Sequence, residues 1–191
     1  MININTVSPI KDIKQLEAMK NFLKGKDTRN FLIFMVGISS ALRISDILRL
    51  KVKDIWDEKR PKEFIMLNEK KTGKAKRFPI TVNLKKAIVQ FMKENDLEQD
   101  DYIFQSRKGN KKAITRSHAA YIISSAADYV GIKEPVSTHS MRKTFGYFCY
   151  KRGVSLALIM EILNHSSISQ TRKYLGLTQE DLDSVYLSLN L

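Results

Sequence analysis

The sequence predicts a single domain that is mainly α-helical and contains one small antiparallel β-hairpin. Through most of the 191 residues, apolar side chains recur at spacings of three and four, which is the period of amphipathic helices. Only residues 64–67 and 77–82 have the pattern of short strands, and a glycine lies in the turn between them. Apolar residues make up 43% and charged residues 28%, as in ordinary globular domains. We therefore expect one α+β domain over residues 1–191.

The first third of the chain predicts helices that pack around a central one. Pro9 opens an apolar pattern that continues to Gly25. Asp27 or Thr28 then caps a second helix, 30–39, which is apolar on nearly every side. Such a helix is typical of the centre of a core. A further short helix follows it.

The middle of the chain predicts the hairpin and two more helices. The hairpin turn, 70–75, takes its left-handed position at Gly73. Asn83 caps an amphipathic helix that ends in an acidic loop. A basic loop, 106–112, leads into a helix of small residues, 117–130.

Three further helices are expected in the last third. One begins at 137–138 and stops at Gly153, and the next begins two residues later. An amphipathic helix forms a C-terminal tail, 178–191, because Thr178 and Asp181 have nearly the spacing and chemistry of a capping box. The apolar face of this tail consists of Leu182, Val185, Tyr186 and Leu189.

The net charge predicts a polyanionic partner. Lys and Arg total 33 and Asp and Glu total 20, which gives a formal net charge of +13 at pH 7. Nucleic acid is the commonest partner for such a charge. No segment approaches the roughly 18 to 20 apolar residues of a membrane-spanning helix, and no signal peptide is visible, so we expect no membrane association.

Cysteine usage favours a reducing compartment. Cys149 is the one cysteine of the chain, which excludes an internal disulfide framework and a thiolate zinc cage. It lies on an apolar helix face, where we expect a core residue. We expect a cytoplasmic protein.

The segment 138–175 contains residues suited to phosphodiester transfer. His139 and Arg142 lie within one helical turn of each other, and His165 follows a predicted buried helix. Tyr174 stands among polar and basic neighbours, unlike an ordinary core tyrosine. Its phenolate, with an unperturbed pKa of about 10, forms more readily than an aliphatic alkoxide. We expect Tyr174 to be the nucleophile, with no nucleotide cofactor.

The other predicted members of this site supply charge and transfer protons. Arg43 and Arg142 offer planar forks that stay charged at any working pH and bind phosphate oxygens with two bonds each. His139 takes the tyrosine proton or binds an oxygen, and His165 donates to the phosphate. Lys71, on a flexible turn, protonates the departing 5′ oxygen.

Asp46 is acidic in a site that should be cationic. It lies three residues after Arg43, and we expect it to orient Arg43 or a histidine from behind. The chain has no cluster of carboxylates for magnesium and no zinc-type spacing of His and Cys. We therefore expect no metal.

Basic residues outside the site are candidates for contacts with nucleic-acid phosphates. They occupy the hairpin, the loop 106–112 and the start of the following helix, where a solvated surface is the alternative. The candidates are Lys70, Lys74, Lys76, Arg107, Lys108, Lys111, Lys112 and Arg116.

Five short motifs occur in a fixed order along the chain. They are A-L-R-I-S-D-I-L-R-L at 41–50, K-K-T-G-K at 70–74, H-S-M-R at 139–142, L-N-H at 163–165 and, further on, Tyr174. In this order they resemble the tyrosine recombinases, the phage-integrase family of site-specific DNA recombinases. The resemblance spans about residues 9–178, essentially the whole catalytic domain of that family.

The resemblance implies an activity, a partner and a site. Members cut double-stranded DNA one strand at a time through a 3′-phosphotyrosyl bond, without metal or ATP, and they work as tetramers on two DNA sites. We accordingly expect a homo-oligomer on DNA and a monomer in solution, with integration, excision or inversion left open. The positions of the family's catalytic set are taken by Arg43, Lys71, His139, Arg142, His165 and Tyr174, with Asp46 as the usual acidic helper.

The chain departs from the family pattern at three points. Asn164 stands where glycine is customary, which asparagine tolerates because it accepts left-handed geometry more easily than most residues. Met141 replaces a leucine. We expect that the N-terminal core-binding domain of typical members is absent, as it is in the short recombinases that invert fimbrial switches.

Two other activities fit the same residues. A type IB topoisomerase-like enzyme would relax DNA by the same chemistry without strand exchange. A noncatalytic DNA-binding module or regulator would keep the fold and the charge without the reaction.

Overall fold

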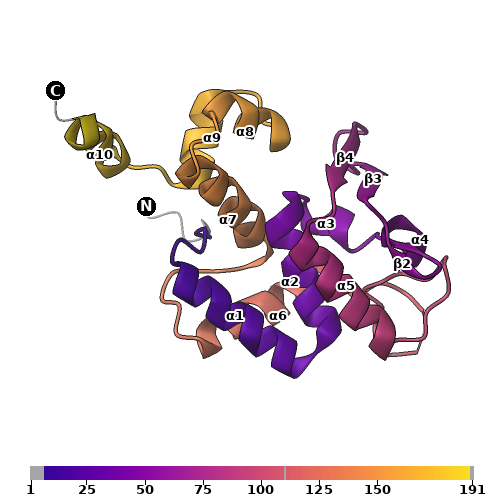
Figure 1. Ribbon diagram of the computed structural model, residues 1–191. Coiled ribbons are helices and arrows are strands. Elements are labelled where there is room, and N and C mark those ends of the chain that lie inside the picture. Colours follow the sequence, from indigo (N-terminus) through magenta and orange to yellow (C-terminus); the bar gives the residue numbers. More distant parts are fainter. Residues whose placement is uncertain (1–6, 110, 190–191) are drawn as a thin grey trace.

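The computed structural model describes residues 7–109 and 111–189, except for the side chains of Leu182, Ser184, Val185 and Leu189. It is mainly helical with two small antiparallel sheets, which confirms the predicted fold class (Figure 1). The helices are α1 (Ile13–Lys26), α2 (Thr28–Ser40), α3 (Ile44–Ile47), α4 (Val52–Ile55), α5 (Val82–Glu94), α6 (Arg116–Tyr129), α7 (Thr138–Lys151), α8 (Leu156–Ile162), α9 (Ile168–Leu175) and α10 (Gln179–Leu189). The strands are β1 (Trp56–Asp57), β2 (Arg60–Pro61), β3 (Phe64–Asn68) and β4 (Ala75–Pro79), and β1 pairs with β2 and β3 with β4.

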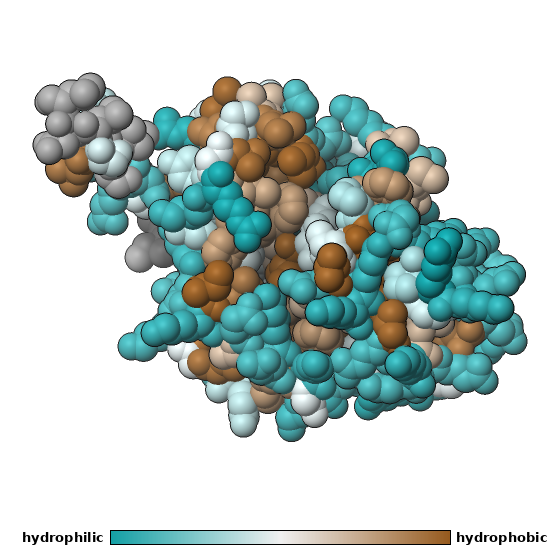
Figure 2. Space-filling view, in the orientation of Figure 1, coloured by the Kyte–Doolittle hydropathy of each residue, from teal (hydrophilic) through white to brown (hydrophobic). Residues whose placement is uncertain are grey.

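Helix α2 is the centre of the core. Five consecutive residues from Leu32 to Val36 are buried, as the sequence predicts for a helix enclosed on nearly every side. It packs on α1, α5 and α7, and Figure 1 shows it between these helices. Gly37 permits the close approach of α7, because a Cβ there would collide with the Met141 side chain. A second, smaller apolar cluster joins α7, α8 and α9, and the half-buried Cys149 packs on it. Figure 2 shows that apolar residues also reach the surface over α8 and α9.

Most helix starts agree with the sequence. Asp27, Ser137 and Ser155 occupy the N-cap positions of α2, α7 and α8. Helix α1 is an exception, because it is capped by Asp12 and does not begin at Pro9.

The hairpin of β3 and β4 ends earlier than predicted. β4 stops at Pro79, because the Thr81 hydroxyl accepts a hydrogen bond from the Leu84 N–H and starts α5 at Val82. Asn83, predicted as the cap of this helix, lies inside its first turn.

The sequence analysis missed α4, the β1–β2 hairpin and α9. Helix α9 matters most, because it carries Tyr174. Ser167 caps its start, and Gly176 ends it in a left-handed conformation with φ 66°. Gly146 of α7 leaves room for α9, since a Cβ there would lie 2.6 Å from the Leu175 side chain.

Helix α10 extends away from the remaining helices in Figure 1. Its start agrees with the prediction, since the Thr178 N–H donates to the Asp181 carboxylate at 2.8 Å. Tyr186 and Leu187 are 77% and 80% exposed. The rest of the predicted apolar face, Leu182, Val185 and Leu189, has side chains outside the described part of the chain. Within the residues described, no helix has both the length and the apolar character to cross a membrane.

Candidate active site

The six predicted catalytic side chains line one pocket of about 260 Å³. They come from the loop before α3, the β3–β4 turn, α7, the α8–α9 loop and α9, and they are Arg43, Lys71, His139, Arg142, His165 and Tyr174. Residues that are up to about 130 positions apart in the sequence thus share one space. Among the residues that the structure describes, no group of three His, Cys, Asp or Glu side chains could hold a metal ion.

Arg142 is fixed in the pocket by backbone carbonyls. Its side chain is 5% exposed, and its two terminal nitrogens donate to the carbonyl oxygens of Ala41 and Leu163. Burial is the main cause that lowers the pKa of Arg142, yet a guanidinium starts so high that it remains charged at neutral pH. The guanidinium therefore connects the C-terminal ends of α2 and α8 and holds its charge in place.

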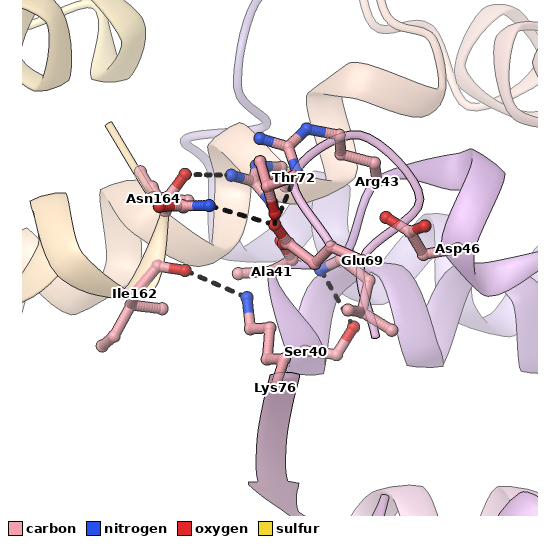
Figure 3. Close-up of polar contacts among 12 residues, drawn as sticks. Ser40, Ala41, Arg43, Asp46, Glu69, Thr72, Lys76, Ile162 and Asn164 are labelled. Carbon is pink, nitrogen blue, oxygen red and sulfur yellow. Dashed lines mark hydrogen bonds and ion pairs between the residues drawn. The ribbon is translucent and has the colours of Figure 1, made fainter. Parts of the chain in front are cut away.

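Arg43 is held by a buried acid that the sequence analysis missed. The NH1 nitrogen of Arg43 donates to Glu69 Oε2 at 2.9 Å, and Glu69 is 2% exposed. The same oxygen accepts hydrogen bonds from the Thr72 hydroxyl at 2.9 Å and the Asn164 amide at 3.2 Å, as Figure 3 shows. Glu69 Oε1 lies 4.0 Å from Arg142 NH1. A carboxylate at the end of β3 thus pairs with one arginine and lies close to the other.

The side chain of Asp46 does not orient Arg43 or a histidine, which corrects the expectation from the sequence. Its Oδ1 accepts a hydrogen bond from the Lys70 backbone N–H at 2.9 Å, and its Oδ2 has no hydrogen-bond partner among the described residues. Because Asp46 is 2% exposed, this bond fixes the start of the β3–β4 turn to α3. The contact that orients Arg43 comes from Glu69.

The lysines of the β3–β4 hairpin have different surroundings. Lys71 is exposed beside the pocket and has no hydrogen-bond or ion-pair partner within the described part of the chain. Lys74 Nζ donates to Asn164 Oδ1 at 3.2 Å. Lys76, expected to contact DNA, points inward and donates to the Ile162 carbonyl at 3.0 Å (Figure 3). Burial, with the nearby arginines, lowers the pKa of Lys76 to about 8, so this lysine belongs to the interior of the site.

The two histidines of the pocket have lowered pKa values and are neutral at pH 7. The Nδ1 atom of His165 lies 3.1 Å from Thr171 Oγ1. Burial, with the charges of Arg142 and Arg43, lowers the pKa of His165 to about 4. The ring of His139 is more exposed, but partial burial and the same arginines also lower its pKa.

Tyr174 presents a buried hydroxyl to the pocket. Its ring meets the His165 ring edge-on with centroids 4.8 Å apart, and the Lys143 ammonium lies 5.2 Å from its centroid. The hydroxyl has no hydrogen-bond partner among the described residues. Burial raises the pKa of Tyr174, while Arg142 and then Arg43 act in the opposite direction and offset part of that rise. Tyr174 is therefore a neutral phenol at pH 7, and it would have to lose its proton to an acceptor before it could act as a nucleophile.

The described residues of the basic loop 106–112 do not line the pocket. Arg107 pairs with Asp27 at the start of α2, and Lys111 lies 3.5 Å from Asp101. The other predicted DNA contacts, Lys70, Lys108, Lys112 and Arg116, are exposed.

A sequence model of the phage integrase family matches residues 11–181. The chain belongs to this family. The matched residues include all six predicted catalytic residues of the pocket.

Relatives of the chain carry the names of recombinases. A protein named probable integrase/recombinase YoeC, from Bacillus subtilis (strain 168), is 37% identical over 183 residues, which cover 96% of this chain and 97% of YoeC. Tyrosine recombinase XerA of Pyrococcus furiosus is 29% identical over 164 residues, which cover 85% of this chain and 55% of XerA. The chain thus spans nearly the whole of one relative and about half of the other. It is a recombinase of the tyrosine class.

A solved structure of the XerH site-specific recombinase has the same fold. That structure, a post-cleavage complex bound to palindromic difH substrate, superposes with a TM-score of 0.74 at 19% identity. The match covers 97% of this chain and 54% of the XerH chain.

Proposed function

We propose that the chain cleaves and rejoins double-stranded DNA at specific sites through a covalent 3′-phosphotyrosyl intermediate, without metal or ATP. The observation that carries this proposal is the convergence of six side chains from five parts of the chain on one pocket. Two guanidinium groups, two imidazoles, one ammonium and one phenol around a single space match the needs of phosphodiester transfer.

Arg43 and Arg142 bind the scissile phosphate in this proposal. Planar guanidinium groups hold phosphate oxygens with paired hydrogen bonds. Because Arg142 is anchored by two carbonyls, its charge is in position before DNA arrives, and fixed charges contribute most to stabilising a transition state. His165 adds a neutral donor to a non-bridging oxygen.

The oxygen of Tyr174 attacks phosphorus while the bond between phosphorus and the 5′ oxygen breaks. His139 accepts the tyrosine proton, and Lys71 gives a proton to the departing 5′ oxygen. The products are a 3′-phosphotyrosine and a free 5′ hydroxyl. In the rejoining step a 5′ hydroxyl attacks the phosphotyrosine and the protons return, so no nucleotide cofactor is needed.

Exposed basic residues hold the DNA backbone around the pocket in this proposal. The net charge of +13 supports a polyanionic partner. Lys70 lies beside the proposed acid Lys71, and Lys108 and Arg116 offer unburied charges further away. These contacts position the duplex without reading its sequence.

We propose a tetramer on two DNA sites, built through α10. This helix lies away from the remaining helices in Figure 1 and exposes Tyr186 and Leu187, so it is free to pack on a neighbouring protomer. A closer relation to short recombinases of the fimbrial-switch type is part of the same proposal, and the match to 97% of the length of YoeC over 183 residues supports it. Size determination with and without DNA tests the assembly: a monomer in both conditions would contradict it.

A trapping experiment tests the reaction. Nicked suicide duplexes, including DNA that flanks the gene for this chain, should give a covalent protein–DNA adduct with the wild type. The variant Tyr174→Phe should form none, whereas Tyr129→Phe, which removes the hydroxyl of an exposed tyrosine on α6, should react normally. An adduct with Tyr174→Phe would contradict the proposed nucleophile.

The same experiment separates the alternatives. A recombinase joins the trapped strand to a second duplex, whereas a topoisomerase-like enzyme relaxes supercoiled DNA without such joining. DNA binding without an adduct on any duplex would favour a noncatalytic module.

A further inference from the structure

Glu69 is a buried carboxylate inside a cationic site. It is 2% exposed, and Arg43, Arg142 and Lys76 all lie near it. A buried charge is strongly unfavourable unless it is paired and hydrogen-bonded. The buried carboxylate of Glu69 therefore requires several hydrogen-bond donors, and the structure supplies them.

A single oxygen of Glu69 receives those donors. Oε2 accepts hydrogen bonds from Arg43 NH1 at 2.9 Å, Thr72 Oγ1 at 2.9 Å and Asn164 Nδ2 at 3.2 Å (Figure 3). Burial raises the pKa of Glu69, but these three hydrogen bonds together bring it below its ordinary value. Glu69 is accordingly ionised at neutral pH.

The three donors belong to three different walls of the pocket. Arg43 precedes α3, Thr72 is in the turn that carries Lys71, and Asn164 directly precedes His165. Arg43, Thr72 and Asn164 line the pocket, but Glu69 does not. The carboxylate therefore lies behind the pocket lining and joins three walls from the protein side.

Asn164 contributes contacts that a glycine at this position would lack. Its backbone is left-handed, with φ 49°, which glycine adopts without strain and asparagine tolerates. Its side chain donates to Glu69 and accepts a hydrogen bond from Lys74 at 3.2 Å. The side chain thus connects the α8–α9 loop to the β3–β4 turn.

We infer that Glu69 is a positioning residue for the proposed DNA cleavage, and this inference rests on that proposed function. Glu69 binds the NH1 nitrogen of Arg43, so that the remaining N–H donors of Arg43 face the phosphate. Thr72 and Asn164 fix the carboxylate in turn. The opposite inference, that Glu69 occupies the phosphate position and blocks the site, predicts effects of opposite sign.

Single-turnover cleavage of a suicide duplex measures this role. Glu69→Ala should lower the cleavage rate constant at saturating DNA by about 10- to 100-fold, with the dissociation constant for DNA changed by less than about threefold. Glu69→Gln, which keeps an oxygen acceptor but loses the charge, should lie between Glu69→Ala and wild type. Glu63→Gln is the matched control, because Glu63 is an exposed acid of the same hairpin and pairs with Lys85. Faster cleavage by Glu69→Ala would overturn the inference in favour of a blocking role.

A changed leaving group shows which pocket wall Glu69 acts through. In a duplex with a 5′-bridging sulfur at the cleaved bond, the thiolate departs without a proton, so Lys71→Ala should regain normal cleavage. The defect of Glu69→Ala should persist, because the phosphate charge still needs Arg43. Recovery of Glu69→Ala on this substrate would show that it acts through the Lys71 turn and would overturn its role in positioning the arginine.

Amide hydrogen exchange in the DNA-free protein tests the role of Glu69 independently of DNA cleavage. Glu69→Ala and Asn164→Ala should each raise amide exchange in the turn between β3 and β4 by about tenfold, with α2 unchanged. Exchange that stays at the wild-type rate in that turn would overturn the inference even if no duplex is cleaved. Absence of cleavage by the wild type, with the exchange result as expected, would count against the proposed function alone.

Discussion

The two sides of the pocket are held in different ways. On the arginine side, Arg142 is bonded to two carbonyls and Arg43 to a buried carboxylate. On the side proposed to transfer protons, Lys71 and His139 have no hydrogen-bond or ion-pair partner among the residues described, and the Tyr174 hydroxyl has no hydrogen-bond partner among them either. Charge is thus fixed in the free protein, whereas the groups proposed to move protons are unengaged.

This difference follows from what each group has to do. Stabilising a transition state favours charges that need no rearrangement when the reaction occurs. A proton donor or acceptor has to meet an atom of the substrate, so its final contacts form only with DNA. Substitutions on the arginine side should therefore change both stability and cleavage, and substitutions on the other side should change cleavage alone.

Arg142→Ala should give the largest effect. We expect cleavage of a suicide duplex to fall by about a thousandfold, because the variant removes a fixed donor to the phosphate. The free energy of unfolding should fall by about 1 to 3 kcal/mol, since the carbonyls of Ala41 and Leu163 lose their donor. Single-turnover kinetics and urea unfolding measure the two quantities. Unchanged stability would contradict the anchored arginine side.

Lys71→Ala should lower cleavage by about a hundredfold, as expected for the loss of a general acid. Its stability should stay within about 0.5 kcal/mol of wild type, because the side chain is exposed and unpaired among described residues. Lys93→Ala, at an exposed lysine of α5 that does not line the pocket, is the control and should cleave nearly normally. A large loss of stability in Lys71→Ala would contradict the claim that this side chain is unengaged in the free protein.

The stability of the free protein should fall as the pH drops from about 6.5 towards 4. The pKa of His165 is about 4 in the folded chain, whereas an ordinary imidazole has a pKa of about 6.5, so the unfolded chain binds more protons in this window. Denaturant unfolding across this range should show a shallower decline for His165→Gln than for wild type. The exposed His118 is the control, and His118→Gln should leave the decline unchanged. Equal pH dependence in wild type and His165→Gln would contradict the burial of this ring.

Lys108→Ala should give the smallest effect. If this lysine contacts one phosphate, the slope of the logarithm of the DNA association constant against the logarithm of the salt concentration should become shallower by about 0.9. Cleavage at saturating DNA should stay normal. Lys20→Ala, on α1 where Lys20 pairs with Glu17, is the control. An unchanged slope would remove Lys108 from the DNA interface.

The sequence predicts the residues that line the pocket better than the residues behind them that hold the lining in place. The six candidate side chains occur in short ordered motifs, so the chain alone could predict that they share one pocket. Glu69 could not, because its burial depends on Asn164, 95 positions away, and an acid beside a lysine-rich turn has the pattern of a surface residue. Because Glu69 pairs with Arg43, Asp46 does not orient that arginine as expected.

The inward position of Lys76 could have been predicted from the sequence pattern of β4. Along β4, exposure alternates: Phe78 is buried and the residues beside it are exposed, and Lys76 lies on the same face as Phe78. This period of two places the lysine on the inner side of the hairpin. The α9 helix was harder to predict, because its eight residues are mostly polar and it is stabilised by contact with α7.

Mapping the residue bound to DNA tests the central claim most directly. Trypsin cleavage of the trapped adduct after Lys173 should release a C-terminal peptide that contains both Tyr174 and Tyr186. Tandem mass spectrometry of this peptide should locate the phosphodiester on Tyr174. A nucleotide attached to Tyr186, or to a residue outside the pocket, would contradict a site in which two prearranged arginines present a phosphate to Tyr174.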